Sequence, residues 1–215
     1  MERSLLSVGN AGADRQRFLQ RDAMQDYLRA YERRGGKDAR NIRSAIRAHI
    51  LPHLGDVRVD RLTRRRVTEW HQELAAASPR LRTRAGTPAS PRRRVIDPSD
   101  TDAIRCRRAS ANRVLSVLKA AMNHAHHEGR IHSTAAWASV KPFREVDAPR
   151  IRFLTDEEIA RLVNACEPGL REIVVASILT GMRYGEITRL RGFDVNAEVG
   201  TITVAVSKSG KARHI

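Results

Sequence analysis

Aromatic residues and cysteines are scarce in this sequence, and it has no long hydrophobic run. Phe, Trp and Tyr make up 4% of the residues, which argues against a surface that stacks the bases of single-stranded nucleic acid on aromatic rings. The two cysteines, Cys106 and Cys166, lie in segments that we interpret as separate domains, so we expect reduced thiols and no disulfide. No stretch approaches the roughly 20 apolar residues that span a bilayer, and residues 1–20 lack the apolar core of a signal peptide. We therefore expect a cytoplasmic protein without a membrane partner.

The charge of the sequence is strongly unbalanced. It has 40 Lys and Arg against 24 Asp and Glu, a formal net charge of +16, which is well beyond what solubility requires. Each phosphate that a Lys or Arg neutralises releases condensed counterions, so a surface this basic binds nucleic acid before any base is read. The hydrophobic content of 41% is ample for a buried core. The composition favours a globular nucleic-acid-binding protein, and it leaves both DNA and an RNA backbone open as partners.

Four helices are predicted before residue 130, because apolar residues recur three and four positions apart. They cover residues 21–34, 38–50, 63–77 and 109–128. Gly35-Gly36 ends the first helix. Pro52 limits the second because it disfavours helix in the residue before it, and Thr63 suits the N-cap of the third. Residues 1–20 show little periodicity, and we interpret them as a flexible tail.

Residues 78–108 interrupt this pattern with prolines, serines and arginines, so a loop is predicted there. Its arginines outnumber its acidic residues. They are Arg80, Arg82, Arg84, Arg92, Arg93, Arg94, Arg105, Arg107 and Arg108. Such a run is either a solvated loop or a segment that folds over phosphates, and the sequence leaves both interpretations open. A second break, at residues 141–152, has the composition of an interdomain linker.

Past this linker the pattern mixes helices with strands. Thr155 followed by Glu158 is the capping-box arrangement of a helix start. A helix over residues 170–179 is so apolar that we expect it to be buried on most sides. Apolar and other residues alternate over residues 201–206, as in a half-buried strand, and residues 211–215 are predicted to form the return strand of a hairpin.

One segment of this second part resembles a known family. The stretch LTGMRYGEI, residues 179–187, is similar to the motif around the first catalytic arginine of tyrosine recombinases, the phage integrase family. The resemblance extends forward to SKSGKAR, residues 207–213, which is similar to the hairpin that bears the catalytic lysine of that family. It extends backward to LTDEEI, residues 154–159, which resembles the start of the catalytic domain. The stretch HILPHLG, residues 49–55, looks like part of the helical core-binding domain.

The resemblance implies a mainly α fold. It consists of an N-terminal helical (SAM-like) core-binding domain, followed by the first part of a mixed α/β integrase catalytic domain that ends in a β-hairpin. In these terms residues 1–20 are the flexible tail, and residues 21–140 are the DNA-binding helical domain with its basic loop at 78–108. Residues 141–152 are the linker, and residues 153–215 are an incomplete catalytic domain.

Three residues carry the chemistry that the resemblance implies. Arg183, which opens a predicted short helix over residues 183–190, would hold the phosphate that is cut, because a guanidinium offers planar donors to the oxygens on which negative charge develops. Glu186, one turn along, would orient this arginine. Lys208, near the hairpin tip, would protonate the departing 5′ hydroxyl. A lone arginine or hairpin lysine is more often simply solvated, and the surrounding motif decides in favour of function. Because a covalent intermediate conserves the bond energy, the family implies no cofactor and no metal.

The tyrosine nucleophile of this family, and the His-x-x-Arg element that precedes it, have no counterpart in the 215 residues. Tyr27 and Tyr31 fit the core face of the first predicted helix, and Tyr184 sits beside the arginine that it would have to serve. We therefore expect a truncated chain, the DNA-binding fragment of a site-specific tyrosine recombinase that does not cleave DNA alone. The alternative is a non-enzymatic DNA-binding protein that occupies or regulates recombination sites.

Double-stranded DNA is the expected partner, together with other recombinase protomers, and no small-molecule substrate is expected. The residues expected to contact DNA lie on the polar sides of the predicted helices and in the basic loop. They are Arg43, Arg47, Arg92, Arg93, Arg94, Asn112, Arg113 and Lys119. The four histidines between residues 124 and 132 lack the spacing of a zinc site, so no metal is expected.

Overall fold

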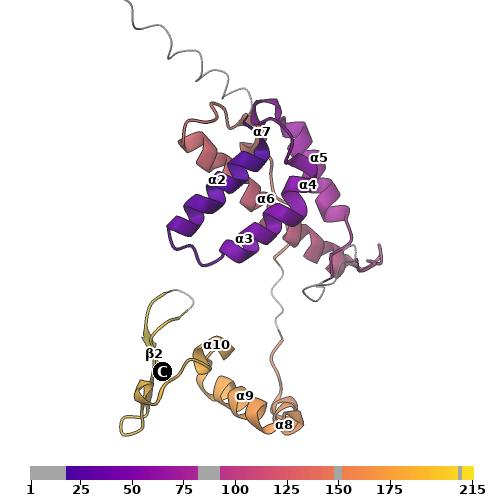
Figure 1. Cartoon of the computed structure of the whole chain (residues 1–215). Coiled ribbons are helices and arrows are strands. Elements are labelled where there is room, and N and C mark those ends of the chain that lie inside the picture. The colour runs from indigo at the N-terminus through magenta and orange to yellow at the C-terminus, as the bar shows by residue number, and fades with distance from the viewer. Residues whose placement is uncertain (1–17, 82–92, 148–151, 208–209) are drawn as a thin grey trace, which may run out of the picture. The chain divides into compact units, whose positions relative to one another are not determined.

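The structure is a computed structural model that describes residues 18–81, 93–147, 152–207 and 210–215. The chain divides into two compact units, Met1–Ala148 and Pro149–Ile215, and each is described by itself (Figure 1). The fold is mainly helical, and the second unit also holds a small three-stranded antiparallel sheet. None of the helices in the described ranges is long and apolar enough to cross a membrane.

The first unit opens with α2, Gln20–Arg33. Its start is fixed by the Leu19 N–H, which donates to the Asp22 carboxylate over 2.9 Å and so satisfies one of the amides that a helix start leaves free. Gly35 adopts a φ of 71°, a left-handed conformation that favours glycine. The chain turns there, where the sequence predicts the end of the helix.

The second helical stretch continues past the proline at which the sequence predicts its end. It consists of α3, Ala39–Ala45, the π-helical turn η1, Ile46–Ile50, and α4, Leu51–Leu54. In the wider turn the Leu51 N–H donates to the Ile46 carbonyl. Pro52 then falls in the first turn of α4, where its missing N–H breaks no intrahelical bond. The predicted end at Ile50 is therefore wrong, and the helical path runs on to Leu54.

The third helix begins and ends close to its predicted bounds. After the short 3-10 turn η2, Val59–Arg61, it forms α5, Arg64–Ala76. Thr63 caps it by accepting the Arg66 N–H over 3.2 Å. The prediction that Thr63 is the N-cap is thus confirmed.

The fourth helix, α6, covers Thr101–His127 and starts earlier than predicted. Asp100 caps this start by accepting the Ala103 N–H over 2.9 Å. Residues 101–108 are therefore helix, although the sequence analysis placed them in a loop. The cap stabilises a helix start that the charged composition of this stretch does not indicate.

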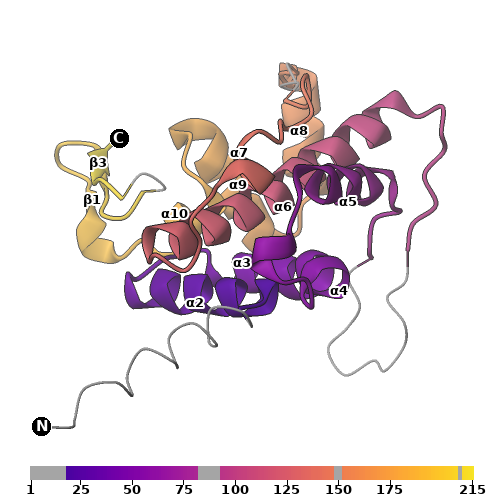
Figure 2. The same cartoon turned by 90° about the horizontal axis from the view of Figure 1, so that it is seen from above.

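The core of the first unit forms where α2, η1 and α5 pack against α6 (Figure 2). The apolar positions predicted to face inward on α5 and α6 are buried. They are Val67, Trp70, Leu74, Val114, Leu115, Leu118, Met122 and Ala125. Trp70 also ties α5 to η1, because its indole N–H donates to the His49 carbonyl over 3.0 Å. Burial of this apolar surface is the main favourable term in the folding of the unit.

Residues 138–147, which begin with the last residue of α7, Ala135–Ala138, return along α6. We call these residues the strap. Three side chains of α6, at intervals of seven residues, hold its backbone, and they are Arg105, Asn112 and Lys119. The Lys119 ammonium donates to the carbonyls of Ala138 (3.2 Å) and Val140 (2.6 Å).

The other two side chains complete this antiparallel arrangement. The Asn112 side chain donates to the Phe143 carbonyl and accepts the Phe143 N–H, both over 2.9 Å. Arg105 donates to the Val146 carbonyl over 2.9 Å. The strap is therefore held to α6 over four helical turns by hydrogen bonds to its main chain.

The second unit begins with three helices. They are α8, Asp156–Ala165, α9, Pro168–Thr180, and α10, Tyr184–Ile187. The predicted capping box at the start of α8 is confirmed. The Glu158 N–H donates to the Thr155 hydroxyl over 3.3 Å, and the Thr155 N–H donates to the Glu158 carboxylate over 3.1 Å.

The packing of α9 differs from the prediction. No residue of α8 or α9 is buried, and Leu179 is 79% exposed. The expectation that α9 is buried on most sides is wrong, because an apolar sequence shows what a helix is able to bury and not whether a partner covers it. Among the described residues of this unit, the buried ones are Cys166, Met182, Glu186 and Val204.

The sheet ends the second unit. After the turn η3, Gly192–Asp194, it consists of β1, Val195–Asn196, β2, Thr201–Val204, and β3, Arg213–His214, in the order β1-β2-β3. In β2 and β3, Thr203 pairs with His214 and Val204 with Arg213. Because paired residues share a face of an antiparallel sheet, the Arg213 side chain is on the same face as the buried Val204.

Candidate functional site

The end of α9 places Arg183 at the start of the next helix. Gly181 adopts a φ of 65° and ends α9 in the left-handed conformation. A residue with a Cβ would be strained there. Arg183 follows as the N-cap residue of α10. A Cβ at Gly181 or at Gly185 would meet no heavy atom of the described chain within 4 Å, so both glycines leave open space beside the arginine.

Glu186 lies against Arg183, one turn along α10. One carboxylate oxygen accepts from the Arg183 guanidinium over 3.0 Å, and the other accepts the Arg183 main-chain N–H over 3.0 Å. The Glu186 side chain is 5% exposed, whereas the Arg183 side chain is 59% exposed. The arrangement holds one guanidinium nitrogen and leaves the Arg183 side chain largely exposed.

A second guanidinium reaches the same carboxylate. Arg213, on β3, donates to Glu186 over 2.8 Å. Arg213 belongs to the hairpin motif, SKSGKAR, but it is not among the site residues predicted from the sequence. Strand alternation was the signal that could have found it, because the residue paired with Val204 shares the inner face of the hairpin.

These contacts keep Glu186 charged. The main-chain N–H of Arg183 is the largest cause that lowers the pKa of Glu186, and the two guanidinium groups lower it further, while burial opposes them. Glu186 is therefore a carboxylate at neutral pH and cannot act as an acid there. Its part is to hold the two arginines.

Two of the predicted site residues, Lys208 and Arg92, lie outside the residues that the structure describes. Lys208 belongs to the connection between β2 and β3, because the strands end at Val204 and resume at Arg213. Arg92 directly precedes Arg93, where the described chain resumes.

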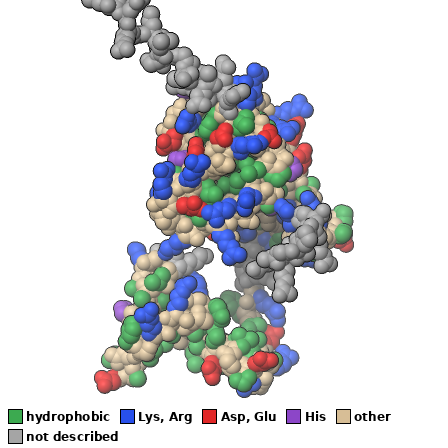
Figure 3. Space-filling view, in the orientation of Figure 1, with side chains coloured by type: hydrophobic (Ala, Val, Ile, Leu, Met, Phe, Trp, Pro, Cys, Tyr) green, Lys and Arg blue, Asp and Glu red, His purple; other side chains and the backbone are tan. Residues whose placement is uncertain are grey.

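The first unit carries a basic hollow of about 610 Å³. It is lined by Arg40, Arg43, Ser44, Arg47, Ala48, His49 and Arg80. Lys and Arg side chains gather over α3 on the face shown in Figure 3. Arg43 forms an ion pair with Glu32, and Arg47 is exposed. The hollow brings together the predicted DNA contacts Arg43 of α3 and Arg47 of η1 with Arg80, an arginine of the predicted basic loop.

The described residues on either side of the gap at 82–92 in the basic loop lie beside this hollow. Residues 80 and 93 form an isolated antiparallel bridge, and the Arg94 N–H donates to the Pro79 carbonyl over 3.0 Å. Arg80 itself donates to the Ala48 carbonyl over 3.2 Å. The predicted contact Arg93 is thus fixed next to the basic hollow, and Arg94 follows it.

His49 belongs to this basic surface. Burial is the largest cause that lowers the pKa of His49, and the charges of Arg80 and Arg107 lower it further. The imidazole is therefore neutral at neutral pH. A bound phosphate would counteract the arginine charges and favour the protonated form.

The three predicted DNA contacts on α6 differ in their surroundings. Arg113 is exposed. The polar groups of Asn112 and Lys119 instead hold the strap, through the bonds to Phe143, Ala138 and Val140.

The three tyrosines differ in their surroundings. Tyr27 and Tyr31 pack against each other on α2, with ring centroids 6.0 Å apart, and burial raises the pKa of Tyr27. Tyr184 is 65% exposed next to Arg183. The described residues contain no group of three or more His, Cys, Asp or Glu that could hold a metal ion.

The sequence matches no model of a protein family and no curated protein. Solved structures match in fold. A lambda integrase tetramer bound to a Holliday junction matches with a TM-score of 0.70 and 20% identity, over 100% of this chain and 55% of that one. A lambda integrase dimer bound to a COC′ core site matches with a TM-score of 0.69 and 18% identity, over 99% of this chain and 52% of that one.

The chain thus spans about half the length of these integrases and has their fold over that length. The predicted fold class is confirmed: a mainly helical chain whose second part adds a small antiparallel sheet.

Proposed function

We propose that these 215 residues bind duplex DNA in site-specific recombination of the tyrosine recombinase type, and that they present Arg183 to a phosphate at the cleavage site. One observation carries the proposal. One guanidinium nitrogen of Arg183 is held by a buried carboxylate, while the side chain is largely exposed, on a chain whose whole length has the fold of an integrase that is bound to DNA in its solved structures.

The geometry suits phosphoryl transfer. In that reaction negative charge builds up on the non-bridging oxygens of the phosphate, and preorganised donors stabilise it without further rearrangement. A guanidinium with one nitrogen held by a buried carboxylate provides such donors. Lys208, on the connection from β2 to β3, is proposed to protonate the leaving 5′ hydroxyl.

The first unit is proposed to hold the DNA backbone. Its basic hollow offers Arg40 and Arg43 from α3, Arg47 from η1 and Arg80, and Arg93 lies beside it. Arg92, Arg94 and Arg113 are proposed as further phosphate contacts. Contacts of this kind give affinity that is independent of sequence and position the protein on the duplex.

Strand cleavage is proposed to need a nucleophile that these residues do not supply. Two of the three tyrosines are packed in the first unit, and Tyr184 adjoins the arginine that binds the phosphate. The 215 residues would therefore occupy a recombination site without cutting it. Other recombinase protomers are proposed as partners, because the similar integrases are a tetramer and a dimer on their DNA.

The DNA-binding half of the proposal is tested by the salt dependence of affinity. We expect the affinity for a mixed-sequence duplex, measured by fluorescence anisotropy, to fall linearly on a log-log plot against salt. Replacing Arg43 and Arg47 together with Gln should reduce the slope by about 1.8, since each phosphate contact contributes roughly 0.9.

The control is Arg65→Gln together with Arg29→Gln, which removes the same charge from α5 and α2. Arg65 is paired with Glu69 over 2.7 Å, and neither residue lines the hollow. An equal loss of slope in the control would mean that the net charge, and not the hollow, binds DNA.

The inability to cleave has its own test. Incubation of the 215-residue chain with a nicked suicide duplex should leave no covalent adduct, and an adduct at Tyr184 would contradict the proposal.

A further inference from the structure

We propose that Arg213 is a positioning residue for Arg183, which it acts on through the carboxylate of Glu186. The inference rests on the proposed function, since it concerns how the phosphate-binding arginine is held. The sequence motif does not assign this part to Arg213, and the structure does so through one contact between β3 and α10.

The two arginines share the Glu186 carboxylate unequally between its two oxygens. One oxygen accepts from the Arg183 guanidinium (3.0 Å), and the other accepts from the Arg183 main chain (3.0 Å) and from Arg213 (2.8 Å). With Arg213 in place, the second oxygen is not available to the Arg183 guanidinium. The Arg183 guanidinium is thereby limited to a single hydrogen bond with Glu186.

Removing Arg213 would change this balance. The second oxygen would keep the Arg183 main-chain N–H but regain one acceptor site, so the carboxylate could form a bidentate pair with the Arg183 guanidinium, which is the stronger arrangement. Arg183 would then turn both donors of one edge towards Glu186 and away from solvent. The charge of the cluster supports the same conclusion, because two guanidinium groups and one carboxylate leave one net positive charge, whereas Arg183 and Glu186 alone leave none.

The exposure of the side chains distinguishes positioning from direct binding. Glu186 is 5% exposed, Arg213 is 40% exposed and Arg183 is 59% exposed. Arg183 is therefore the member of the cluster that is best placed to meet a ligand. One guanidinium nitrogen of Arg213 donates to Glu186, and Arg213 shares a face of the hairpin with the buried Val204.

The contact also joins the hairpin to α10. Arg213 lies on the strand to which the connection containing Lys208 returns. A single buried carboxylate thus fixes both the arginine of α10 and the base of the hairpin, which ties together two elements that the proposed function needs in one site.

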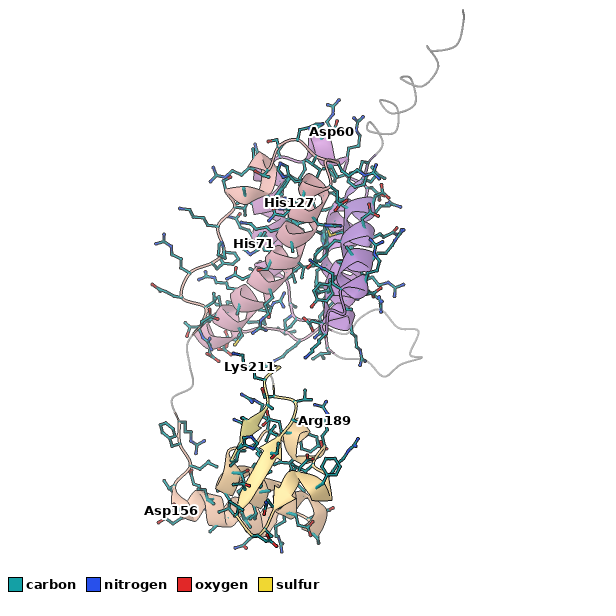
Figure 4. All side chains as sticks on the ribbon, turned by 90° about the vertical axis from the view of Figure 1, so that its left-hand side faces the viewer. Asp60, His71, His127, Asp156, Arg189 and Lys211 are labelled. Carbon is teal, nitrogen blue, oxygen red and sulfur yellow. The ribbon has the colours of Figure 1, made fainter. Side chains whose placement is uncertain are left out.

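A double-mutant cycle on the full 215-residue chain tests the inference, with affinity for a mixed-sequence duplex as the measurement. Arg183→Met should weaken binding about five- to tenfold at about 0.1 M salt, the effect of one phosphate contact. Arg213→Met should cost up to the same factor alone and nothing further in the Arg183→Met background. Arg213→Lys should restore affinity, because only one nitrogen of Arg213 binds Glu186. The matched control is Arg189→Met, an exposed arginine of the same unit (Figure 4) that forms no ion pair with a described residue.

A second measurement on the free protein separates the possible outcomes. Carbon NMR of the Glu186 carboxyl should show a raised pKa in Arg213→Met and an unchanged one in Arg213→Lys and Arg189→Met. Losses that multiply in the double variant would make Arg213 an independent DNA contact and overturn the inference, as would an Arg213→Met variant that binds like the wild type while Arg183→Met does not. If Arg183→Met itself binds normally, the proposed role of Arg183 fails and the inference falls with it, while the Glu186 titration still reports whether the ion pair exists. Thermal unfolding of each variant shows whether a loss of affinity reflects loss of the fold.

Discussion

His71 is a buried titratable residue beneath the strap. It is 3% exposed, and its ring stacks on Phe143 with centroids 4.4 Å apart. Burial is the largest cause that lowers the pKa of His71 below its ordinary value of 6.5. The Asn112 side chain raises the pKa as a hydrogen-bond partner of the imidazole, and the charge of Lys119 lowers it. The folded unit therefore disfavours the imidazolium, which the unfolded chain accepts freely.

This difference makes the stability of the first unit depend on pH. Because the folded pKa is the lower one, His71 has no effect above pH 6.5, and stability falls as the pH drops below that value by at most about 1.4 kcal/mol per pH unit. Urea unfolding at neutral pH and at about pH 5 should show the loss. His71→Phe should reduce it, whereas the exposed His127→Phe (Figure 4) should not. An unchanged pH profile in His71→Phe would assign the loss to other groups, of which His49 is one with a lowered pKa.

At the residue scale the sequence predicts best where a motif is local. The contact of Arg183 with Glu186 lies within one helical turn, and the spacing alone brings the two side chains together. Arg213 is distant in sequence from both, and its contact depends on the register of the hairpin. The DNA contacts predicted on α6 show the same limit, because nothing local indicates that Asn112 and Lys119 reach main-chain groups of the strap.

Among the elements, helix faces were predictable and helix ends were less so. Three- and four-residue spacing identifies the buried faces of α5 and α6, because each face must cover apolar area. The start of α6 depends on the Asp100 cap, and the continuation of α4 past Pro52 depends on the π-helical turn before it. A proline or a charged run lowers the expectation of helix without excluding it when the local hydrogen bonds are made otherwise.

The strap allows a prediction about stability at this scale. Asn112→Ala removes both hydrogen bonds to Phe143 and leaves its main-chain groups without them, so the first unit should lose about 1–3 kcal/mol. Urea unfolding measures the loss, and hydrogen exchange at the Phe143 amide should accelerate. Ser116→Ala serves as the control, because its hydroxyl bonds only to the Asn112 carbonyl within the same helix. Equal exchange at Phe143 in the two variants would contradict the role of Asn112 in holding the strap.

Considered as a whole, the molecule has one well-packed unit and one sparsely packed unit. The first buries a continuous set of apolar side chains around α6. In the second, large apolar side chains remain exposed, among them Phe153, Leu170, Leu179 and Phe193. An exposed apolar surface of this kind is typical of a site that another polypeptide covers.

The two units should therefore differ in independent stability. A chain of residues 18–147 is expected to unfold cooperatively. Its midpoint should be close to that of the cooperative transition of the full chain. Residues 152–215 alone should show no cooperative transition and should bind a hydrophobic dye such as ANS. Calorimetry and dye fluorescence check both. A sharp transition of residues 152–215 without dye binding would mean that the second unit is stable despite its exposed apolar surface.

The order of elements across the whole chain was predictable, and the degree of packing was not. Thr155, Gly181 and the alternation in β2 are local signals, and they place the helices and the hairpin in the right sequence. The exposure of α8 and α9 depends on what lies against them, which the residues of those helices do not encode.

Two α6 side chains that hold the strap, Asn112 and Lys119, are also predicted DNA contacts. Lys119 and Asn112 now bond to carbonyls and an amide of the strap, and a nucleic acid phosphate on this side of α6 would compete with those groups for the same donors. Docking of DNA there and loosening of residues 138–147 would then be reciprocally coupled, so that each strengthens the other. Trypsin cleavage after Arg144, an exposed strap residue that is followed by Glu145, should then become faster when DNA is bound.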